Sequence, residues 1–539
     1  MNSSNPPSWL ALTGKPPKFL GKAPLHHKPE VIRALLVELI ASLPQSPTKR
    51  EAWLRSRRWI DPSVVYRLIE EYLKTFDARE PRNTLTDDDM RLLFDARKLT
   101  RSDSLPDAWC NAFFVYEERE IVRRRPIFEP IVNDVIASHS DDPEFDVSVQ
   151  YTSRDDIRRA VFTSECAVQF DFSAWFDQFT LHPEIRKFFG VLSPDGPAVA
   201  TVLVMGHKGA CQVANAATSS IADVGLPEVQ TAVIVDNVRF AGTVASATKA
   251  GELFIQRADS VHAVLKDRSI KPQTEEDFVG EHYDYVKKTR SLTQKTQKKA
   301  VFALELLQKR DTFRARQLLA VYGLLLYAAN TLRVTIARFH WAMRFLSHVS
   351  STELSFEHRV PPGVRIELLE WAKIAAANVP VAVWLEDSSE PDFTIYTDAS
   401  ASGWGAVSIS KNGSVLQLSE PWSQKDLAAY DLQSSVQAEP LAVVYAVQAL
   451  VPAHAKEVVI YTDHLPFVFA FQSTFGHAWS YSMAVQYLMS RCTRFQVRFV
   501  QGETNPADVL SRARHPPQAV PPQFLSVTSV AGHLFKEGE

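Results

Sequence analysis

The stretch that decides the fold of the C-terminal part of the chain is 393–410, FTIYTDASASGWGAVSIS. Its apolar, β-branched and aromatic runs indicate strands. Two later stretches, VVIYTDH at 458–464 and FQVRFVQG at 495–502, have the same strand character. Between the first two lies QAEPLAVVYAVQAL at 437–450, whose apolar spacing is helical. This order of elements predicts a mixed sheet flanked by helices.

Four acidic residues lie at the ends of these strands or on the faces of these helices: Asp398, Glu439, Asp463 and Asp508. Asp398 and Asp463 each follow a Tyr-Thr pair, at the point where a buried strand should end and its next side chain should emerge. Clustered carboxylates are the hard oxygen ligands that Mg²⁺ prefers, and two such ions can activate a water and stabilise the leaving oxygen of a phosphodiester. Any one of these acids alone is more simply a turn former or a helix cap. Four of them in the order strand, helix, strand, helix favour a metal site.

Two strand-like runs further upstream also carry acids. CAVQFDF at 166–172 contains Asp171, and TAVIVDNVRF at 231–240 is centred on Asp236. Strands and helical segments alternate here, which suggests an α/β or α+β domain built around a sheet. Two acids on adjacent strands could hold paired metal ions for nucleotidyl transfer.

The composition limits the class of protein. The chain has 539 residues, for which we expect three or four domains. Its 45% hydrophobic and 22% charged residues exclude collagen, coiled coil and wholesale disorder. The four cysteines form no CxxC pair, which argues against a disulfide framework or a zinc ribbon. There is no apolar run of about 18 residues, so we expect no membrane span and an intracellular location, in the cytoplasm, the nucleus or both.

The charge is unevenly distributed along the chain. The formal net charge of −3 argues against a uniformly basic nucleic-acid coat. Residues 283–316, however, hold ten Lys and Arg against three acids, a local charge of +7. We expect 283–348 to be helical and basic. The simplest interpretation of such a run is a solvated helix face.

These patterns divide the chain into five predicted segments. They are a Pro-rich arm and helical region at 1–105, a sheet-based domain at 106–282, a helical segment at 283–385, the strand-rich domain at 386–515 and a Pro-rich tail at 516–539.

The C-terminal motifs resemble the four catalytic blocks of retroelement RNase H domains: TDASASGWGA, AEPLAVVYA, YTDH and GETNPADVLSR. The resemblance covers about residues 392–514 and assigns the catalytic and metal-binding set to Asp398, Glu439, Asp463 and Asp508. It implies hydrolysis of the RNA strand of an RNA–DNA hybrid, recognised through its A-form shape and 2′-OH groups, with two Mg²⁺ or Mn²⁺ ions. No histidine follows the third block at the position usual in cellular RNases H, which implies slower product release.

Residues 112–300 resemble the fingers and palm of a reverse transcriptase. VYEEREIVRRRPI resembles the fingers block that holds the incoming triphosphate, which implies that role for Arg124 and Arg125. FDFSAWF resembles motif A, with Asp171 as a metal ligand. Phe176 then falls where an aromatic ring lies under the sugar and excludes a ribose 2′-OH, which favours dNTP over NTP. The alternative for Phe176 is an ordinary core residue.

Three further blocks extend this resemblance. VMGHKGACQVANA resembles motif B, whose glycines let the backbone approach template and nucleotide; Met205, Gly206, Lys208 and Gly209 fall on it. IVDNV resembles motif C, which normally has two acids; here Asp236 is kept and Asn237 replaces the second. DFVGEHYDYVKKTRSLTQK resembles the primer grip, with Phe278 and Gly280 on its Phe-x-Gly. The basic run after it would then hold the phosphates of the hybrid.

Taken together, the resemblance implies a multidomain α+β and α/β chain: a right-hand polymerase of fingers, palm and thumb or connection, followed by an RNase H-like mixed sheet flanked by helices. The expected partners are an RNA template, a DNA primer, the RNA–DNA hybrid and dNTPs, with no membrane and with a recombinase or another protein of the same element as a further partner. No Asp-Thr/Ser-Gly protease motif precedes these blocks and the chain ends soon after NPADVLSR. This layout is most similar to tyrosine-recombinase retrotransposons of the DIRS/VIPER kind, with gypsy-type LTR elements as the alternative.

Two other functions stay open at this point. The chain could be a degenerate or domesticated copy that serves as a nucleic-acid-binding or structural protein, which Asn237 and the unusual motif B favour. It could also have lost the polymerase activity and kept only hybrid cleavage. The four RNase H acids argue against complete decay.

Overall fold

The structure is a computed structural model that describes residues 18–19, 47–76, 80–117, 123–384 and 390–512. The chain splits into two compact units, one of Met1–Val279 with Tyr283–Thr289 and one of Gly280–His282 with Arg290–Glu539. Nearly all of residues 1–46 of the predicted N-terminal segment, residues 386–389 at the start of the predicted strand-rich domain and all of the tail at 516–539 lie outside the described residues.

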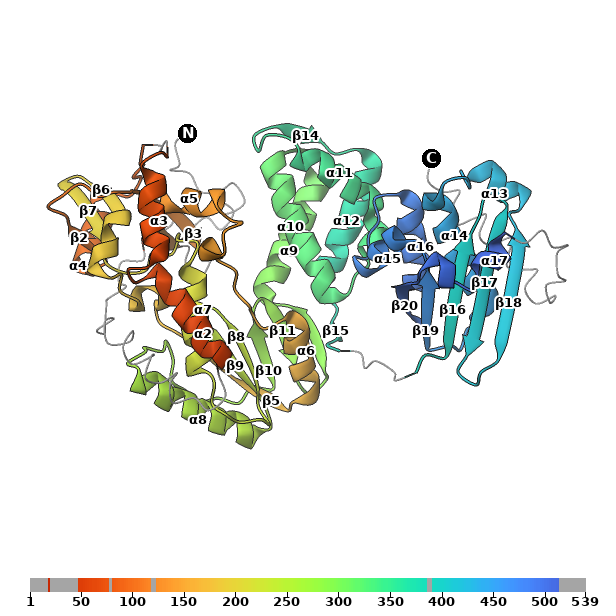
Figure 1. Ribbon diagram of the computed structural model, residues 1–539, viewed down its shortest axis with the longest axis horizontal. Helices are drawn as coiled ribbons and strands as arrows, with labels where there is room; N and C mark the ends of the chain where they lie inside the picture. Colours follow the sequence, from red (N-terminus) through yellow and green to blue (C-terminus); the bar gives the residue numbers. More distant parts are fainter. Residues whose placement is uncertain (1–17, 20–46, 77–79, 118–122, 385–389, 513–539) are drawn as a thin grey trace. The chain divides into compact units, whose positions relative to one another are not determined.

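The first unit alternates helices with short strands (Figure 1). Its helices are α2 (Pro47–Ser56), η2 (Arg57–Trp59), α3 (Val64–Leu73), α4 (Asp87–Asp95), α5 (Val132–Ser138), η3 (Pro143–Phe145), α6 (Arg154–Thr163), η4 (Trp175–Gln178), η5 (Pro183–Phe188), α7 (Ala210–Ile221) and α8 (Val244–Ser260). Its strands are β1 (Lys18–Phe19), β2 (Leu99–Arg101), β3 (Cys110–Glu117), β4 (Arg123–Pro130), β5 (Cys166–Asp171), β6 (Gly190–Ser193), β7 (Gly196–Ala200), β8 (Gln230–Ile234), β9 (Asn237–Gly242) and β10 (Glu275–Phe278).

Three small sheets organise this unit, with strand orders β1-β4-β3, β2-β7-β6 and β5-β9-β8. The last is antiparallel throughout, and α6, α7 and α8 pack against it. One hydrophobic core runs through the unit, from Trp53 to Leu265, and it includes residues of α2, η2 and α3. The predicted boundary near residue 105 therefore separates segments that share one core.

The second unit holds a group of helices followed by a five-stranded domain. The helical group consists of α9 (Gln294–Lys309), α10 (Ala315–Leu332), η6 (Ile336–Phe339), α11 (His340–Ser350) and α12 (Pro362–Ala377), with the short strands β13 (Thr312–Arg314), β14 (Glu357–Arg359) and β15 (Val381–Ala382). The last domain consists of β16 (Phe393–Ala399), β17 (Gly403–Ser410), β18 (Val415–Pro421), α13 (Gln424–Ala429), α14 (Ser435–Leu450), β19 (Glu457–Thr462), α15 (Leu465–Gln472), α16 (Trp479–Ser490), β20 (Arg494–Phe499), η7 (Gly502–Thr504) and α17 (Asp508–Ser511).

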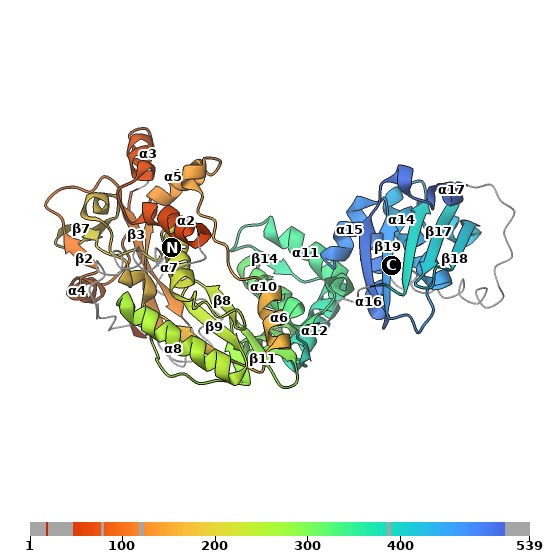
Figure 2. The same cartoon turned by 60° about the horizontal axis from the view of Figure 1, so that its bottom comes forward.

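The five strands of this last domain form one mixed sheet in the order β18-β17-β16-β19-β20. The pairs β18–β17 and β17–β16 are antiparallel, while β16–β19 and β19–β20 are parallel. Helix α14 packs along the middle strands, α15 and α16 contact β20, and α17 contacts β16, β17 and β18 (Figure 2). The predicted strands at 393–410, 458–464 and 495–502 and the helix at 437–450 are all present.

The prediction that residues 283–348 are helical from their start is wrong for the segment before Gln294. The chain forms strands β11 (Glu281–Asp284) and β12 (Thr289–Leu292) there, joined by a turn in which Lys288 has a positive φ of 55°. Within β11, Glu281 and Tyr283 are buried while His282 between them is partly exposed, which is the two-residue period of a strand. The helix begins only at Gln294, where the Thr293 side chain caps it by accepting from the Thr296 backbone N–H.

Within the described part of the chain, no helix combines the length and the apolar character that crossing a membrane requires.

Candidate functional site

The two Tyr-Thr-Asp segments lie side by side because their strands are parallel neighbours in register. Tyr396 pairs with Tyr461, and the two rings stack with centroids 5.0 Å apart. Two residues further on, the same register brings Asp398 and Asp463 to the carboxyl ends of β16 and β19. Parallel strands end at the same edge of a sheet, so two locally similar sequences deliver two carboxylates to one place.

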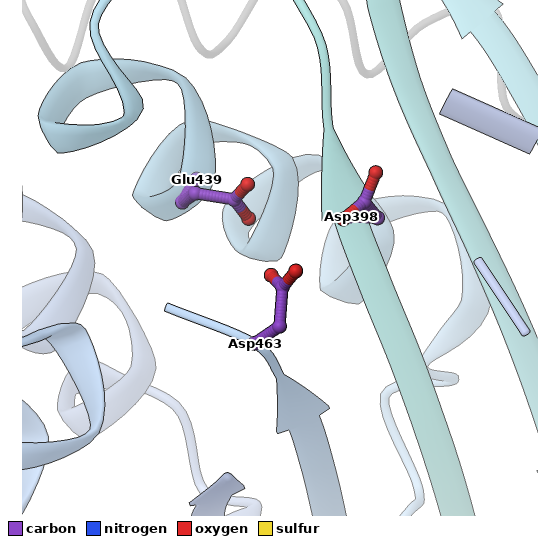
Figure 3. A group of neighbouring side chains, drawn as sticks. All are labelled: Asp398, Glu439 and Asp463. Atoms are coloured by element: carbon purple, nitrogen blue, oxygen red, sulfur yellow. The ribbon is translucent and has the colours of Figure 1, made fainter. Parts of the chain in front are cut away.

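Glu439 reaches this place from α14. Ligand atoms of Asp398, Glu439 and Asp463 all lie within 4.8 Å of one another, and Figure 3 shows the three carboxyl groups converging. The following residue, Pro440, lies inside the helix and cannot donate to the carbonyl of Val436. The Ser480 hydroxyl donates to that carbonyl instead, at 2.6 Å, so the helix continues through the segment that carries Glu439.

Asp508 lies at the start of the short helix α17, next to the cluster but outside the group of three. Its carboxylate forms an ion pair with Arg512 at 2.6 Å. Helix α17 can approach the sheet only because Gly405 has no side chain: a Cβ there would lie 2.5 Å from the Ser511 backbone nitrogen and 2.6 Å from the Ala507 carbonyl oxygen. The Ser511 hydroxyl donates to Asp398 Oδ2. The four predicted acids are thus gathered at one edge of the sheet, three of them in direct proximity.

The electrostatics of the cluster are those of a cation site. Burial, and then the charges of Asp398 and Asp463, raise the pKa of Glu439 to about 9. Burial and the neighbouring carboxylates raise the pKa of Asp398 to about 6, and burial also raises the pKa of Asp463. Glu439 Oε1 accepts from the Ala399 backbone N–H at 3.3 Å, whereas its buried Oε2 has no hydrogen-bond partner among the described residues. Carboxylate oxygens that repel one another, one of them without a hydrogen-bond partner among the described residues, fit a hard divalent cation such as Mg²⁺.

The first unit brings a second pair of carboxylates together. Asp171, the last residue of β5, pairs with Asn237 at the start of β9, and its neighbour Phe172 donates its backbone N–H to the Asp236 carbonyl at 3.2 Å. Burial, and then the nearby charge of Asp171, raise the pKa of Asp236. The structure therefore places these two predicted metal ligands at the ends of adjacent strands with interacting carboxyl groups.

Asp236 is presented by a strained two-residue turn between β8 and β9. Val235 has a φ of +57°, which is unfavourable for a β-branched residue. Two side chains of α7 hold it: Asn215 Oδ1 accepts from the Val235 backbone N–H at 3.0 Å, and the Thr218 hydroxyl donates to the Val235 carbonyl at 2.6 Å. The asparagine at the second motif C position, Asn237, donates to Asp236 Oδ1 at 3.0 Å.

The predicted motif B residues form a loop that leads into α7. A Cβ on Gly206 would lie 2.3 Å from the Phe128 carbonyl oxygen, so only glycine allows this approach of two backbones. Asn133, which lies in none of the predicted motifs, forms two hydrogen bonds with the backbone of this loop. Its side-chain amide donates to the Gly206 carbonyl at 2.7 Å and accepts from the Lys208 backbone N–H at 2.9 Å. The Lys208 side chain is exposed.

The predicted triphosphate-binding arginines lie on β4. Arg125 Nη1 contacts Met205 Sδ at 3.5 Å, and its charge counteracts the rise in the pKa of Asp236, which puts it beside the carboxylate pair. The Arg124 side chain lies outside the described part of the chain. Phe176 is half-buried against the core of the unit, so its role under a sugar stays a prediction.

One cationic group near the pair could not be found from the sequence. Lys266 Nζ lies 2.8 Å from Asp171 Oδ2, and its backbone N–H donates to the Asp171 carbonyl at 2.8 Å. Lys266 is 95 positions from Asp171 in a segment with no strand or helix signal. Only the folded chain reveals the pairing.

Comparisons with known proteins bear on the last domain most directly. Residues 388–487 match the RNase H-like domain found in reverse transcriptase. Among curated proteins, none matches the chain.

Three similar solved structures are of the foamy viral protease–reverse transcriptase. The first, of a form called dRH in complex with double-stranded DNA, is 13% identical with a TM-score of 0.43, over 90% of this chain and 83% of that one. The second, also with double-stranded DNA, has 13% identity and a TM-score of 0.42, over 91% and 100% of the two chains. The third, with an RNA/DNA hybrid, has 13% identity and a TM-score of 0.42, over 91% and 65%.

The sheet order, the flanking helices and the family match agree. The predicted RNase H-like mixed sheet flanked by helices is confirmed for the last domain, whose sequence matches the RNase H-like domain found in reverse transcriptase over residues 388–487.

Proposed function

We propose that this chain is an RNA-directed DNA polymerase with ribonuclease H activity, encoded by a retrotransposon. The observation that carries the proposal is the cluster of Asp398, Glu439 and Asp463 in a domain that matches the RNase H-like domain found in reverse transcriptase. The interacting pair of Asp171 and Asp236 supports the polymerase activity.

The cluster in the last domain suits hydrolysis of the RNA strand of an RNA–DNA hybrid. A pair of bound Mg²⁺ or Mn²⁺ ions would supply an activated water and positive charge for the leaving oxygen. Asp398 and Asp463 offer carboxylate oxygens from the ends of parallel strands, and Glu439 offers its buried Oε2 from the helix. Ser511 fixes the orientation of Asp398, while Asp508 adds a fourth negative charge nearby.

The first unit suits nucleotide addition to a DNA primer on an RNA template. Asp171 and Asp236 would hold the two metal ions, and Arg125, whose charge acts on Asp236, would bind the triphosphate of the incoming dNTP. The loop at 205–209 would let the backbone approach template and nucleotide. Phe176 would exclude the ribose 2′-OH. The element would be of the DIRS/VIPER kind or, as the alternative, a gypsy-type LTR element, with its recombinase as a further partner.

Cleavage of the hybrid without polymerisation is the second candidate function. Both carboxylates of the polymerase pair already have partners from the chain itself: Lys266 pairs with Asp171, and Asn237 donates to Asp236. A metal ion bound through Asp171 Oδ2 would have to displace Lys266 from that oxygen. The predicted polymerase site has two of the acids predicted from the sequence, Asp171 and Asp236. The last domain has four such acids at one edge of its sheet.

Cleavage of a labelled RNA strand in an RNA–DNA hybrid tests the ribonuclease activity. Wild-type protein should cut the hybrid with Mg²⁺ or Mn²⁺, and Asp398→Asn should abolish cutting. Lys411→Gln, which changes an exposed side chain of the same domain, is the control and should cut normally. A wild-type protein that cuts nothing with either metal would contradict the proposal.

Primer extension on an RNA template tests the polymerase activity. Wild-type protein should extend the primer with dNTPs, Asp171→Asn and Asp236→Asn should not, and the surface variant Asp195→Asn should behave as wild type. Hybrid cleavage without extension would select the second candidate. Neither activity, together with binding of the hybrid, would instead indicate a degenerate copy that only binds nucleic acid.

A further inference from the structure

A tryptophan of the N-terminal helical region, Trp59, is built into the predicted polymerase site. It ends η2 and is fully buried. Its carbonyl accepts from the Tyr66 hydroxyl at 2.9 Å, and the guanidinium of Arg58 lies 4.9 Å from the centre of its ring. Residues of its own segment therefore contact both the backbone and the ring of Trp59. None of the motifs that resemble reverse transcriptase includes this segment.

The Trp59 indole packs against the loop at 205–209. A Cβ on Gly209 would lie 2.5 Å from the indole, so the ring occupies the space that a side chain would need. The His207 imidazole meets the indole edge-on, with centroids 5.3 Å apart. The indole thus packs against the side of the loop at 205–209, which the resemblance assigns to contact with template and nucleotide.

The same indole fixes the start of α7 by a hydrogen bond. Trp59 Nε1 donates to Gln212 Oε1 at 2.6 Å, and Gln212 Nε2 donates to the carbonyls of Ser148 at 2.9 Å and Asp146 at 3.3 Å. Gln212 is therefore held at both ends of its amide. Removing one partner of a buried amide leaves a polar group unsatisfied and frees its orientation.

Helix α7 connects the hydrogen-bonded Gln212 to the turn that presents the proposed metal ligand Asp236. Asn215 lies one turn after Gln212, and Asn215 and Thr218 hold the strained Val235 turn that presents Asp236. A short path of direct contacts therefore leads from Trp59 through one helix to Asp236. Both the loop and the turn depend on where α7 begins.

Trp53 shows what an ordinary core tryptophan in this segment looks like. It is as deeply buried as Trp59 and lies with its ring 6.3 Å from the Phe179 ring, but its indole N–H has no hydrogen-bond partner among the described residues. Trp53 thus serves the core by packing, whereas Trp59 also makes a directed hydrogen bond and fills the space beside a glycine.

We propose that Trp59 is a positioning residue for nucleotide addition, which sets the geometry of the loop at 205–209 through Gly209 and Gln212. This inference rests on the proposed polymerase function. According to this inference, the N-terminal helical region contributes a residue to the proposed polymerase site.

The test compares Trp59→Phe with Trp53→Phe in the full-length chain. Loss of one hydrogen bond, worth about 1 kcal/mol, corresponds to roughly a fivefold change. We expect Trp59→Phe to raise the KM for dNTP about fivefold with kcat nearly unchanged, and Trp53→Phe to leave KM unchanged. Hydrogen exchange of the peptide spanning 203–212 should accelerate in Trp59→Phe and not in Trp53→Phe.

A double-mutant cycle tests the contact itself. Gly209→Ala should strongly lower the rate of extension in the wild-type background, and the smaller ring of Trp59→Phe should restore part of it, because the two changes act on the same space. Strict additivity of the two changes, or unchanged KM and unchanged exchange in Trp59→Phe, would overturn the inference. A wild-type protein that extends no primer would overturn the proposed function before any variant is compared.

Discussion

Replacing Glu439 by glutamine is expected to stabilise the metal-free protein. The Glu439 carboxyl is buried next to two other carboxyls, and its pKa is raised from 4.5 to about 9. A glutamine at this position would keep the local hydrogen bond, since an amide oxygen can accept from the Ala399 backbone N–H as the carboxyl does. Glu439→Gln therefore removes the cost of a carboxyl that stays protonated at neutral pH in the metal-free protein, and it leaves the shape of the side chain in place.

The sign and size of the effect follow from proton linkage. Below pH 4.5 Glu439 is protonated in both the folded and the unfolded chain, so its ionisation costs nothing. Between pH 4.5 and about 9 only the unfolded chain ionises, and the free energy of unfolding falls by about 1.4 kcal/mol per pH unit. At pH 7 the cost reaches on the order of 3 kcal/mol, which is the upper limit of the gain expected for Glu439→Gln.

Denaturation of the last domain measures this gain. Urea unfolding in EDTA, followed by pulsed hydrogen exchange of peptides from β16 and β19, gives the stability of this domain separately from the rest. The difference between Glu439→Gln and wild type should be near zero at acidic pH, close to the pKa of an unperturbed glutamate, and should grow steadily as the pH rises to neutrality and beyond. Glu503→Gln changes an exposed glutamate and should show no such trend. A difference that does not depend on pH would refute the reasoning from burial and repulsion.

Addition of Mg²⁺ should reverse the order of stability. A ligand that binds only the folded state at roughly 100 times its Kd adds about 2.7 kcal/mol. Wild-type protein should gain this stabilisation, while Glu439→Gln, which lacks one anionic ligand, should gain much less at the same concentration. Equal gains in both proteins would show that Glu439 is not a metal ligand.

Three further predictions concern the first unit. Gly206→Ala should abolish primer extension and lower stability by about 1–3 kcal/mol, because its Cβ would overlap the Phe128 carbonyl oxygen; normal thermal unfolding would contradict this. Asn237→Asp should lower the Mg²⁺ concentration needed for half-maximal extension, since it adds a carboxylate beside Asp236; an unchanged Mg²⁺ titration would exclude position 237 from the metal site. Arg239→Met should cost about 3–5 kcal/mol in urea unfolding by taking the ion-pair partner from the fully buried Glu276, and the double change Arg239→Met with Glu276→Met should recover most of that loss.

The sequence predicted the last domain well because its signals are local. Each strand is a short apolar run, and Asp398 and Asp463 directly follow such runs. Once the two strands are parallel neighbours, the equal spacing of Tyr-Thr-Asp in both brings the acids together. The prediction failed at 283–292, which was expected to be helical and instead forms β11, a turn and β12.

The residues that contact Asp171, the loop at 205–209 and the start of α7 could not be predicted in the same way. Lys266, Asn133 and Trp59 contact residues that lie 95, 73 and 153 positions away in the chain, and none of the three stands in a motif. A lysine or an asparagine in a loop has many possible neighbours, and only packing of the whole unit selects one. The same holds for Gly405, whose need for glycine arises from the helix that carries Ser511, far later in the chain.

By itself the sequence determined the strands at 393–410, 458–464 and 495–502, the helix at 437–450 and the identity of the acids, because these depend on periodicity and residue type over a few positions. Only the tertiary structure decided which groups meet: that three of four acids in the last domain lie within 4.8 Å, that Asp171 is paired with Lys266, and that a tryptophan supports the glycine loop. The physical reason is that burial, repulsion between like charges and close backbone approach depend on distances between segments that are far apart in the chain.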